Sequence, residues 1–129
     1  MNFPSNLKYT ESNEWLYQDG SQGSIGITDF AQDQLSDVVF VEILVSPGDS
    51  IRKGDAIATV ESVKAAAEVY SPVSGKVINT NDSLANTPEM INQDPYRAAW
   101  MIKIELTDPG EIAGLMDASA YQAFCQEQG

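Results

Sequence analysis

Short apolar stretches alternate with turn residues along most of the chain. Stretches rich in β-branched or alternating apolar residues lie at 24–27, 38–45, 56–63, 67–70, 76–79 and 99–106. Turns that contain proline and glycine separate several of them, as at Ser46-Pro47-Gly48-Asp49 and Ser71-Pro72-Val73-Ser74-Gly75. Short strands at such regular spacing predict a mainly β fold, a sandwich or a barrel-like sandwich, rather than a parallel sheet.

Two segments carry helical signals, and the first follows the stretch at 24–27. Thr28 is a good N-cap, and Asp29 places an acidic side chain in the first turn. Phe30 and Leu35 then recur at helical spacing. The pattern predicts a short internal helix that ends near Ser36.

The second helical segment is predicted at about 109–127. Asp108 is interpreted as its N-cap, with Pro109 at the first helical position and Glu111 at the third. A break is expected at Asp117. The apolar residues expected to share one helix face are Ile112, Leu115 and Met116, continued by Tyr121 and Phe124.

Length and composition are those of one ordinary globular domain. The 129 residues are 43% hydrophobic and 20% charged, which allows a real core. No linker divides the chain, so residues 1–129 are predicted to form a single domain. Residues 1–10 lack the features of a secretory signal or a transit peptide. We therefore expect a bacterial cytoplasmic protein, or a mitochondrial matrix protein if the chain is a processed organellar form.

The charge balance excludes several classes of partner. The chain has 19 acidic and 7 basic side chains and a net charge of −12. Phosphate backbones and anionic lipids would repel such a surface, which argues against nucleic acid and membrane binding. The charge either serves solubility alone or steers the protein toward partners with basic docking surfaces.

Residues for catalysis or metal binding are scarce. The chain has no histidine, and Cys125 is its single cysteine. We therefore predict no catalytic residue, no metal site and no internal disulfide. Trp15 and Trp100 are interpreted as core or cleft-wall side chains. Cys125 is interpreted as a thiol without a function in a frayed terminal helix.

One lysine occupies a position suited to modification. Lys64 lies between two predicted strands, at the tip of a hairpin expected at about 56–70, and three alanines follow it at 65–67. An exposed amine with small neighbours leaves room for an enzyme to attach a prosthetic group. An ordinary surface lysine in a β-turn has the same local pattern, so the hairpin alone leaves both interpretations open.

The wider sequence resembles a known family. Glu61-Ser62-Val63-Lys64-Ala65, followed by Ser71-Pro72-Val73-Ser74-Gly75-Lys76-Val77, is similar to the lipoylation hairpin of glycine cleavage H-proteins. Further stretches resemble this family in the same order along the chain, at 9–16, 26–32, 37–42, 88–92, 94–96, 100–101 and 115–117, and at Tyr121. The chain departs from the family at Asn13, where histidine is usual, at Ser36, where glycine is frequent, and in the turn at Ser46-Pro47.

The resemblance implies a fold and a function. The fold would be a barrel-sandwich hybrid of antiparallel sheets, of the lipoyl/biotinyl-carrier type, with a short internal helix and a helical C-terminus. Lipoic acid would be joined to Lys64 through an amide bond by a lipoate-attaching enzyme. The chain would be a non-catalytic carrier, most simply a monomer. It would pass the aminomethyl group of glycine between glycine decarboxylase (P-protein), the tetrahydrofolate-dependent aminomethyltransferase (T-protein) and dihydrolipoyl dehydrogenase (L-protein).

The resemblance also implies a cleft that protects the loaded arm from water. Ser12, Glu14 and Glu68 occupy the matching positions and would offer polar or acidic partners to the cationic amine. Each of them could equally be an ordinary surface residue.

Other functions compete with this interpretation. A lipoyl or biotinyl domain of a multienzyme complex would typically have Asp-Lys-Ala or Met-Lys-Met at the tip, whereas this chain has Val63-Lys64-Ala65. A lipoyl relay donor to 2-oxoacid dehydrogenase complexes would have the same sequence features as a glycine cleavage carrier. An unmodified interaction domain is a further alternative. An autonomous hydrolase or transferase ranks last, because no nucleophile and base are paired in the sequence.

Overall fold

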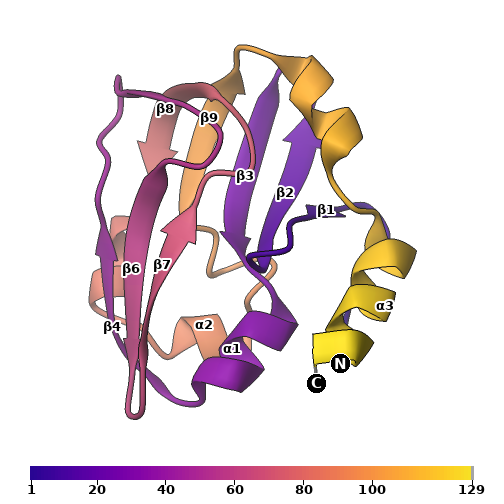
Figure 1. Cartoon of the computed structure of the whole chain (residues 1–129). Helices are drawn as coiled ribbons and strands as arrows, with labels where there is room; N and C mark the ends of the chain where they lie inside the picture. Colours follow the sequence, from indigo (N-terminus) through magenta and orange to yellow (C-terminus); the bar gives the residue numbers. More distant parts are fainter. Residues whose placement is uncertain (129) are drawn as a thin grey trace.

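Two antiparallel sheets form most of the computed structural model, which describes residues 1–128 (Figure 1). One sheet has six strands in the order β1-β2-β3-β9-β8-β5, and the other has three in the order β4-β6-β7. The strands are β1 Lys8–Tyr9, β2 Glu14–Asp19, β3 Gln22–Ile27, β4 Val38–Ile43, β5 Ser50–Ile51, β6 Ala56–Ser62, β7 Ala66–Tyr70, β8 Gly75–Thr80 and β9 Ile102–Leu106.

Short helices occupy the ends and connections of the strands. The α-helices are α1 Asp29–Leu35, α2 Met90–Gln93 and α3 Ala118–Gln128, and the 3₁₀ helices are η1 Asp82–Ala85 and η2 Pro109–Gly114. The prediction of a mainly β, antiparallel fold with a short internal helix and a helical C-terminus is confirmed. Among residues 1–128, no helix is long and apolar enough to cross a bilayer.

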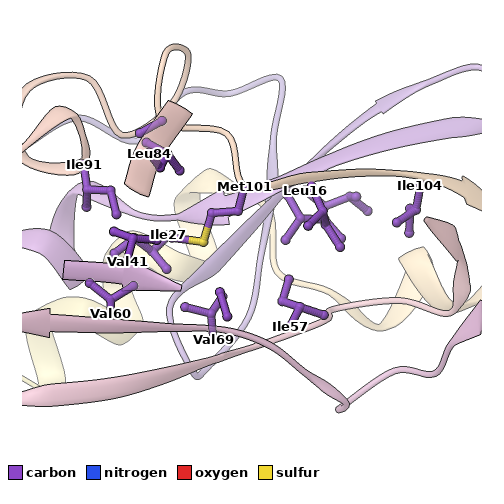
Figure 2. Close-up of a cluster of buried hydrophobic side chains, with 14 of the residues drawn as sticks. Leu16, Ile27, Val41, Ile57, Val60, Val69, Leu84, Ile91, Met101 and Ile104 are labelled. Carbon is purple, nitrogen blue, oxygen red and sulfur yellow. The ribbon is translucent and has the colours of Figure 1, made fainter. Parts of the chain in front are cut away.

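The main hydrophobic core lies between the two sheets (Figure 2). Val60 of β6 and Val69 of β7 point into it from the smaller sheet, and Leu16 and Ile104 contribute from the larger one. All four side chains are almost completely buried. Burying an aliphatic side chain of this size contributes about 1.5–3 kcal/mol. The core therefore holds the β6–β7 hairpin by its inner face, while the turn of the hairpin extends past α1 at the lower edge of Figure 1.

The predicted internal helix is present with the predicted N-cap. The Thr28 hydroxyl accepts a hydrogen bond from the Ala31 N–H at 3.1 Å. The helix ends at Leu35, and Ser36 caps it with φ 64° and ψ −151°. Few residues other than glycine adopt this combination, because the Cβ atom meets the backbone. Ser36 is thus a strained helix cap at the position where the resembled family frequently has glycine.

A second, smaller cluster joins the C-terminal helix to the N-terminal strands. The Tyr121 ring of α3 stacks on Tyr9 with ring centroids 4.6 Å apart. The Tyr121 hydroxyl donates to the Asn13 side-chain oxygen at 2.8 Å and lies 2.7 Å from the Thr28 hydroxyl oxygen. Burial raises the pKa of both tyrosines above the ordinary value. The prediction that Cys125 lies in a frayed terminal helix was wrong, because its thiol is buried in this cluster.

The C-terminal segment differs from the predicted helix in its first half. Residues 109–114 form a 3₁₀ helix, and within the described chain the Asp108 side chain forms no capping bond. Glu111 instead accepts hydrogen bonds from the Ser74 N–H at 2.7 Å and from the Ser74 hydroxyl at 2.9 Å. The residues predicted to share one helix face also separate, because Ile112 packs on the main core and Met116 on the second cluster.

The strain at Ser36 can be tested by replacing the residue with glycine. We expect Ser36→Gly to increase the free energy of unfolding by about 1 kcal/mol, since relief of about 1–3 kcal/mol of strain exceeds the entropy that glycine adds to the unfolded chain. Ser46→Gly is the matched control, because Ser46 is not among the positive-φ residues and glycine should destabilise there. Urea unfolding of both variants checks the opposite signs. A destabilised Ser36→Gly variant would show that the cap is not strained.

Candidate functional site

Lys64 lies in the turn between β6 and β7, and its side chain is exposed. Ser62 holds this turn from within. Its hydroxyl oxygen accepts the N–H groups of Ala65 at 3.0 Å and Lys64 at 3.3 Å, and its own N–H donates to the Ala65 carbonyl at 2.7 Å. These bonds use only the backbone of Lys64. The amine is therefore presented by an ordered turn that leaves the side chain available for chemistry.

The turn is also tied to the neighbouring strand. The Val63 N–H donates to the Asp37 carbonyl at 3.0 Å, and Ser62 pairs with Val38 at the start of β4. These contacts connect the tip to β4, and the pairing of Glu61 with Ala66 connects it to β7. Together with the buried inner face of the hairpin, they make the tip a rigid support for Lys64.

The structure brings the other predicted site residues together. Ser12, Glu14 and Glu68 line one groove of about 160 Å³, although they come from the turn before β2, from the first residue of β2 and from β7. Its other lining residues are Asn13, Ile27, Ala31, Gln34, Leu35, Val60, Ala67 and Val69. A groove of this size is smaller than the usual 300–1,000 Å³ of a small-molecule pocket, so it suits only the end of an extended group.

Glu14 is the most constrained residue of this groove, with 1% of its surface exposed. One carboxylate oxygen accepts the hydroxyls of Thr10 and Ser12, each at 2.6 Å, and the other accepts the Tyr70 N–H at 3.2 Å. All these donors are neutral, and no basic side chain is among the groove's described lining residues. A carboxylate can accept about four hydrogen bonds, so Glu14 keeps capacity for a cationic donor.

Ser12 and Glu68 are both exposed at the rim of the groove. Lys64 does not line the groove. The nearest lining residue along β7 is Ala67, three residues from Lys64, or about 10 Å at the usual strand rise. Lys64 and the acidic groove are therefore neighbouring features, and only a side chain longer than lysine would connect them.

Sequence reasoning missed two partners of Glu14. The Thr10 hydroxyl donates to the same carboxylate oxygen of Glu14 as the Ser12 hydroxyl does. The Tyr70 N–H, from a distant part of the sequence, donates to the other oxygen. The Thr10 contact could have been predicted, because the hydroxyls of Thr10 and Ser12 lie four and two residues before the Glu14 carboxylate in the sequence. The Tyr70 contact depends on β2 and β7 meeting in space, which no local pattern indicates. Among residues 1–128, no group of three or more potential ligand side chains could hold a metal ion.

A wider depression of about 620 Å³ lies apart from these residues. Trp15 and Trp100 border it, as expected of cleft-wall aromatic side chains. Its lining carries charges of both signs, because Arg97 and Lys103 lie there together with acidic side chains. The Lys103 amine also lies 4.6 Å from the centre of the Trp100 ring. The depression thus selects no single class of ion.

Comparisons with known proteins match nearly the whole chain to one family. The family model described as glycine cleavage H-protein matches residues 7–128. The chain is 52% identical to the glycine cleavage system H protein of Anaeromyxobacter sp. (strain K), over 99% of both chains. It is 48% identical to the mitochondrial glycine cleavage system H protein 2 of Arabidopsis thaliana, over 95% of this chain and 78% of that one. A crystal structure of a glycine cleavage system H protein from Mycobacterium marinum superposes with a TM-score of 0.83 at 28% identity, covering 98% of this chain and 99% of that chain.

The role of Ser62 in ordering the tip can be tested by amide hydrogen exchange. Ser62→Ala removes the hydroxyl that accepts the Lys64 and Ala65 N–H groups. Each hydrogen bond is worth about 0.5–1.5 kcal/mol, so exchange at Lys64 and Ala65 should accelerate roughly three- to tenfold. Exchange at Ile57, inside β6, should not change. Ser62→Thr keeps the hydroxyl and serves as the control. Equal exchange rates in the wild type and in Ser62→Ala would show that Ser62 does not order the turn.

Proposed function

The chain belongs to the glycine cleavage H-protein family, and on that premise we propose that it is the lipoyl carrier of a glycine cleavage system. It would pass the aminomethyl group of glycine between the P-protein decarboxylase, the T-protein aminomethyltransferase and the L-protein dihydrolipoyl dehydrogenase. The observation that carries the proposal is the exposed Lys64 side chain on an ordered hairpin turn, within the stretch that resembles the family's lipoylation hairpin.

The residues of the tip fit a covalently attached lipoyl group. The turn hydrogen bonds leave the Lys64 amine unused, and the alanines at 65–67 leave space around it. When attached, the lipoyl dithiolane supplies thiol–disulfide chemistry and a sulfur that holds the transferred unit. Ser62 and the Asp37 carbonyl keep the support in place, and the chain contributes position rather than catalysis.

The groove supports a protective role for Glu14. A buried carboxylate that is bonded only to neutral donors attracts an alkylammonium group, and charge-assisted hydrogen bonds are stronger than neutral ones. Apolar side chains, among them Ile27, Val60 and Val69, also line the groove, which limits access of water. We propose that Glu14 holds the cationic amine and that Ser12 and Glu68 form the polar rim.

The remaining parts of the proposal concern the whole chain. Residues 1–129 would act as a single carrier domain, with no catalytic residue and no metal of its own. A lipoate-attaching enzyme would modify Lys64 before the cycle begins. The relatives include bacterial proteins and a mitochondrial one, so the site of action would be a bacterial cytoplasm or a mitochondrial matrix.

Modification of Lys64 is the direct test of this function. Incubation with lipoate, ATP and a lipoate-protein ligase should add one lipoyl group, which intact mass and peptide mass spectrometry would locate on the Lys64 peptide. Lys64→Arg keeps the charge but should remain unmodified. Lys76→Arg is the control and should be modified like the wild type. Lipoylation of Lys64→Arg, or an unmodified wild type, would contradict the proposal.

The role of Glu14 can be tested on the loaded protein. Glu14→Ala should accelerate hydrolytic loss of the aminomethyl group about tenfold or more, since a hydrogen bond to a charged group is worth about 1.5–3 kcal/mol. Glu14→Gln keeps the shape and should show an intermediate rate. Glu11→Ala removes an exposed acid nearby and should leave the rate unchanged. The release of formaldehyde and ammonia over time gives the rate. If the three variants match the wild type, Glu14 does not protect the arm.

A further inference from the structure

One buried hydroxyl joins two segments that line the groove around Glu14. The Tyr121 hydroxyl of α3 donates a hydrogen bond to the Asn13 side-chain oxygen at 2.8 Å. The same hydroxyl oxygen lies 2.7 Å from the Thr28 hydroxyl oxygen. Tyr121 is completely buried and is not among the groove's described lining residues. Any effect of Tyr121 on the groove therefore passes through its neighbours.

The hydrogen bonds run in one direction through these side chains. A tyrosine hydroxyl has one proton, and the Tyr121 proton is used on Asn13. The Thr28 hydroxyl is therefore the donor to Tyr121, and its oxygen accepts the Ala31 N–H at 3.1 Å. Burial raises the pKa of Tyr121 above its ordinary value, so the hydroxyl keeps its proton and remains a donor. The three side chains thus form one fixed, fully hydrogen-bonded unit.

Asn13 connects this unit to the acidic part of the groove. It lies between Ser12 and Glu14 in the sequence, and its backbone has φ 73°, which asparagine tolerates better than most residues. Its carbonyl accepts the Thr28 N–H at 3.1 Å. Asn13 is thus held by its side chain and by its backbone. The residues on either side of it, whose hydroxyl and carboxylate oxygens lie 2.6 Å apart, are fixed with it.

Thr28 connects the unit to the helical part of the groove. It is the N-cap of α1, and the α1 residues Ala31, Gln34 and Leu35 line the groove. Figure 1 shows α1 between α3 and the β6–β7 hairpin in this view. A hydroxyl on α3 therefore joins the turn before β2 to α1, at a distance from the turn that carries Lys64.

We propose that Tyr121 is a positioning residue of the carrier, whose hydroxyl holds the turn before β2 against α1 and so keeps the Glu14 carboxylate in place for the amine of the loaded arm. This inference rests on the proposed function, in which the groove protects that amine from water. Protection depends on the fit of the groove's walls, because a loosened groove admits water. The C-terminal helix thus controls the lifetime of the loaded arm, although Tyr121 lies neither in the groove nor at the hairpin tip.

A matched pair of variants separates positioning from stability. Tyr121→Phe keeps the ring that stacks on Tyr9 and removes only the hydroxyl. Tyr9→Phe is the control, because it removes a hydroxyl from a completely buried ring of the same cluster, one that donates to the Pro4 carbonyl instead. Thermal unfolding midpoints measure the stability that each variant loses. Asn13→Gly removes the acceptor of the same bond at a backbone conformation that suits glycine, and it replaces Tyr121→Phe if that variant does not fold.

Amide hydrogen exchange of the unmodified chain gives the first measurement. Exchange at Thr28, whose N–H is bonded to the Asn13 carbonyl, should accelerate roughly three- to tenfold in Tyr121→Phe, the factor expected for one hydrogen bond. Exchange at Tyr70, whose N–H is bonded to the Glu14 carboxylate, should accelerate by a similar factor. The control variant should leave both amides at the wild-type rate. Equal acceleration in the two variants would show a general loss of stability and would overturn the positioning role.

Hydrolysis of the loaded protein gives the second measurement. Tyr121→Phe should lose the aminomethyl group about threefold faster or more than Tyr9→Phe, measured as released formaldehyde and ammonia. Tyr121→Phe combined with Glu14→Ala should be no faster than Glu14→Ala alone, because the hydroxyl acts through that carboxylate. Additive acceleration in the double variant would overturn this route.

The outcomes separate the positioning role from the function. If Tyr121→Phe hydrolyses at the rate of Tyr9→Phe while Glu14→Ala is fast, the positioning role is overturned, and the carrier function and its groove remain. If Glu14→Ala hydrolyses at the wild-type rate, the protective groove and the positioning role are overturned together. A wild type that is not lipoylated at Lys64 overturns the carrier function itself.

Discussion

The position of Lys64 depends on burial of one face of the β6–β7 hairpin against the six-stranded sheet. Val60 and Val69 fix that face in the core, and a slip of one residue would turn them to solvent. The register that satisfies the core therefore also decides which residues reach the turn. Ser62 then closes the turn with its hydroxyl. Lys64 lies at the exposed turn because the strands on both sides of it are held in the core by Val60 and Val69.

The same hairpin also forms part of the groove that contains Glu14. β7 places Ala67 and Glu68 beside the start of β2, and the Tyr70 N–H reaches the Glu14 carboxylate. A buried acid without a basic partner is costly unless hydrogen bonds satisfy it, and here hydroxyl and amide donors do so. The arrangement stabilises Glu14 without neutralising its charge. A chain with few basic residues can thus keep an anionic interior site beside an exposed amine.

Local patterns predicted those parts of the molecule that local physics determines. The alternating stretches gave the strands of the hairpin, and Thr28 is the N-cap that its side chain suggested. Strand β2 was not predicted, because it begins with a run of buried residues and shows no alternation. Asp108 is the N-cap residue that was predicted, with Pro109 at the first helical position, but within residues 1–128 its side chain makes no capping bond. Glu111 is engaged by Ser74 instead, a partner distant in the sequence. The motif around Lys64 was recognisable, whereas the Glu14 hydrogen-bond network required the folded chain.

Strand β4 contains a β-bulge at Val39, because Val38 and Phe40 pair with consecutive residues of β6. This bulge has a consequence for how molecules of this protein meet one another. Strand β4 stands at one end of the three-stranded sheet, where backbone N–H and C=O groups without a neighbouring strand can template a strand from a second molecule. Outward apolar side chains on such an edge would ordinarily favour aggregation. A bulge breaks the even row of donors and acceptors and increases the local twist, so a second straight strand cannot match it. The additional residue, which leaves both Val39 and Phe40 exposed, thus also hinders edge-to-edge pairing in concentrated protein.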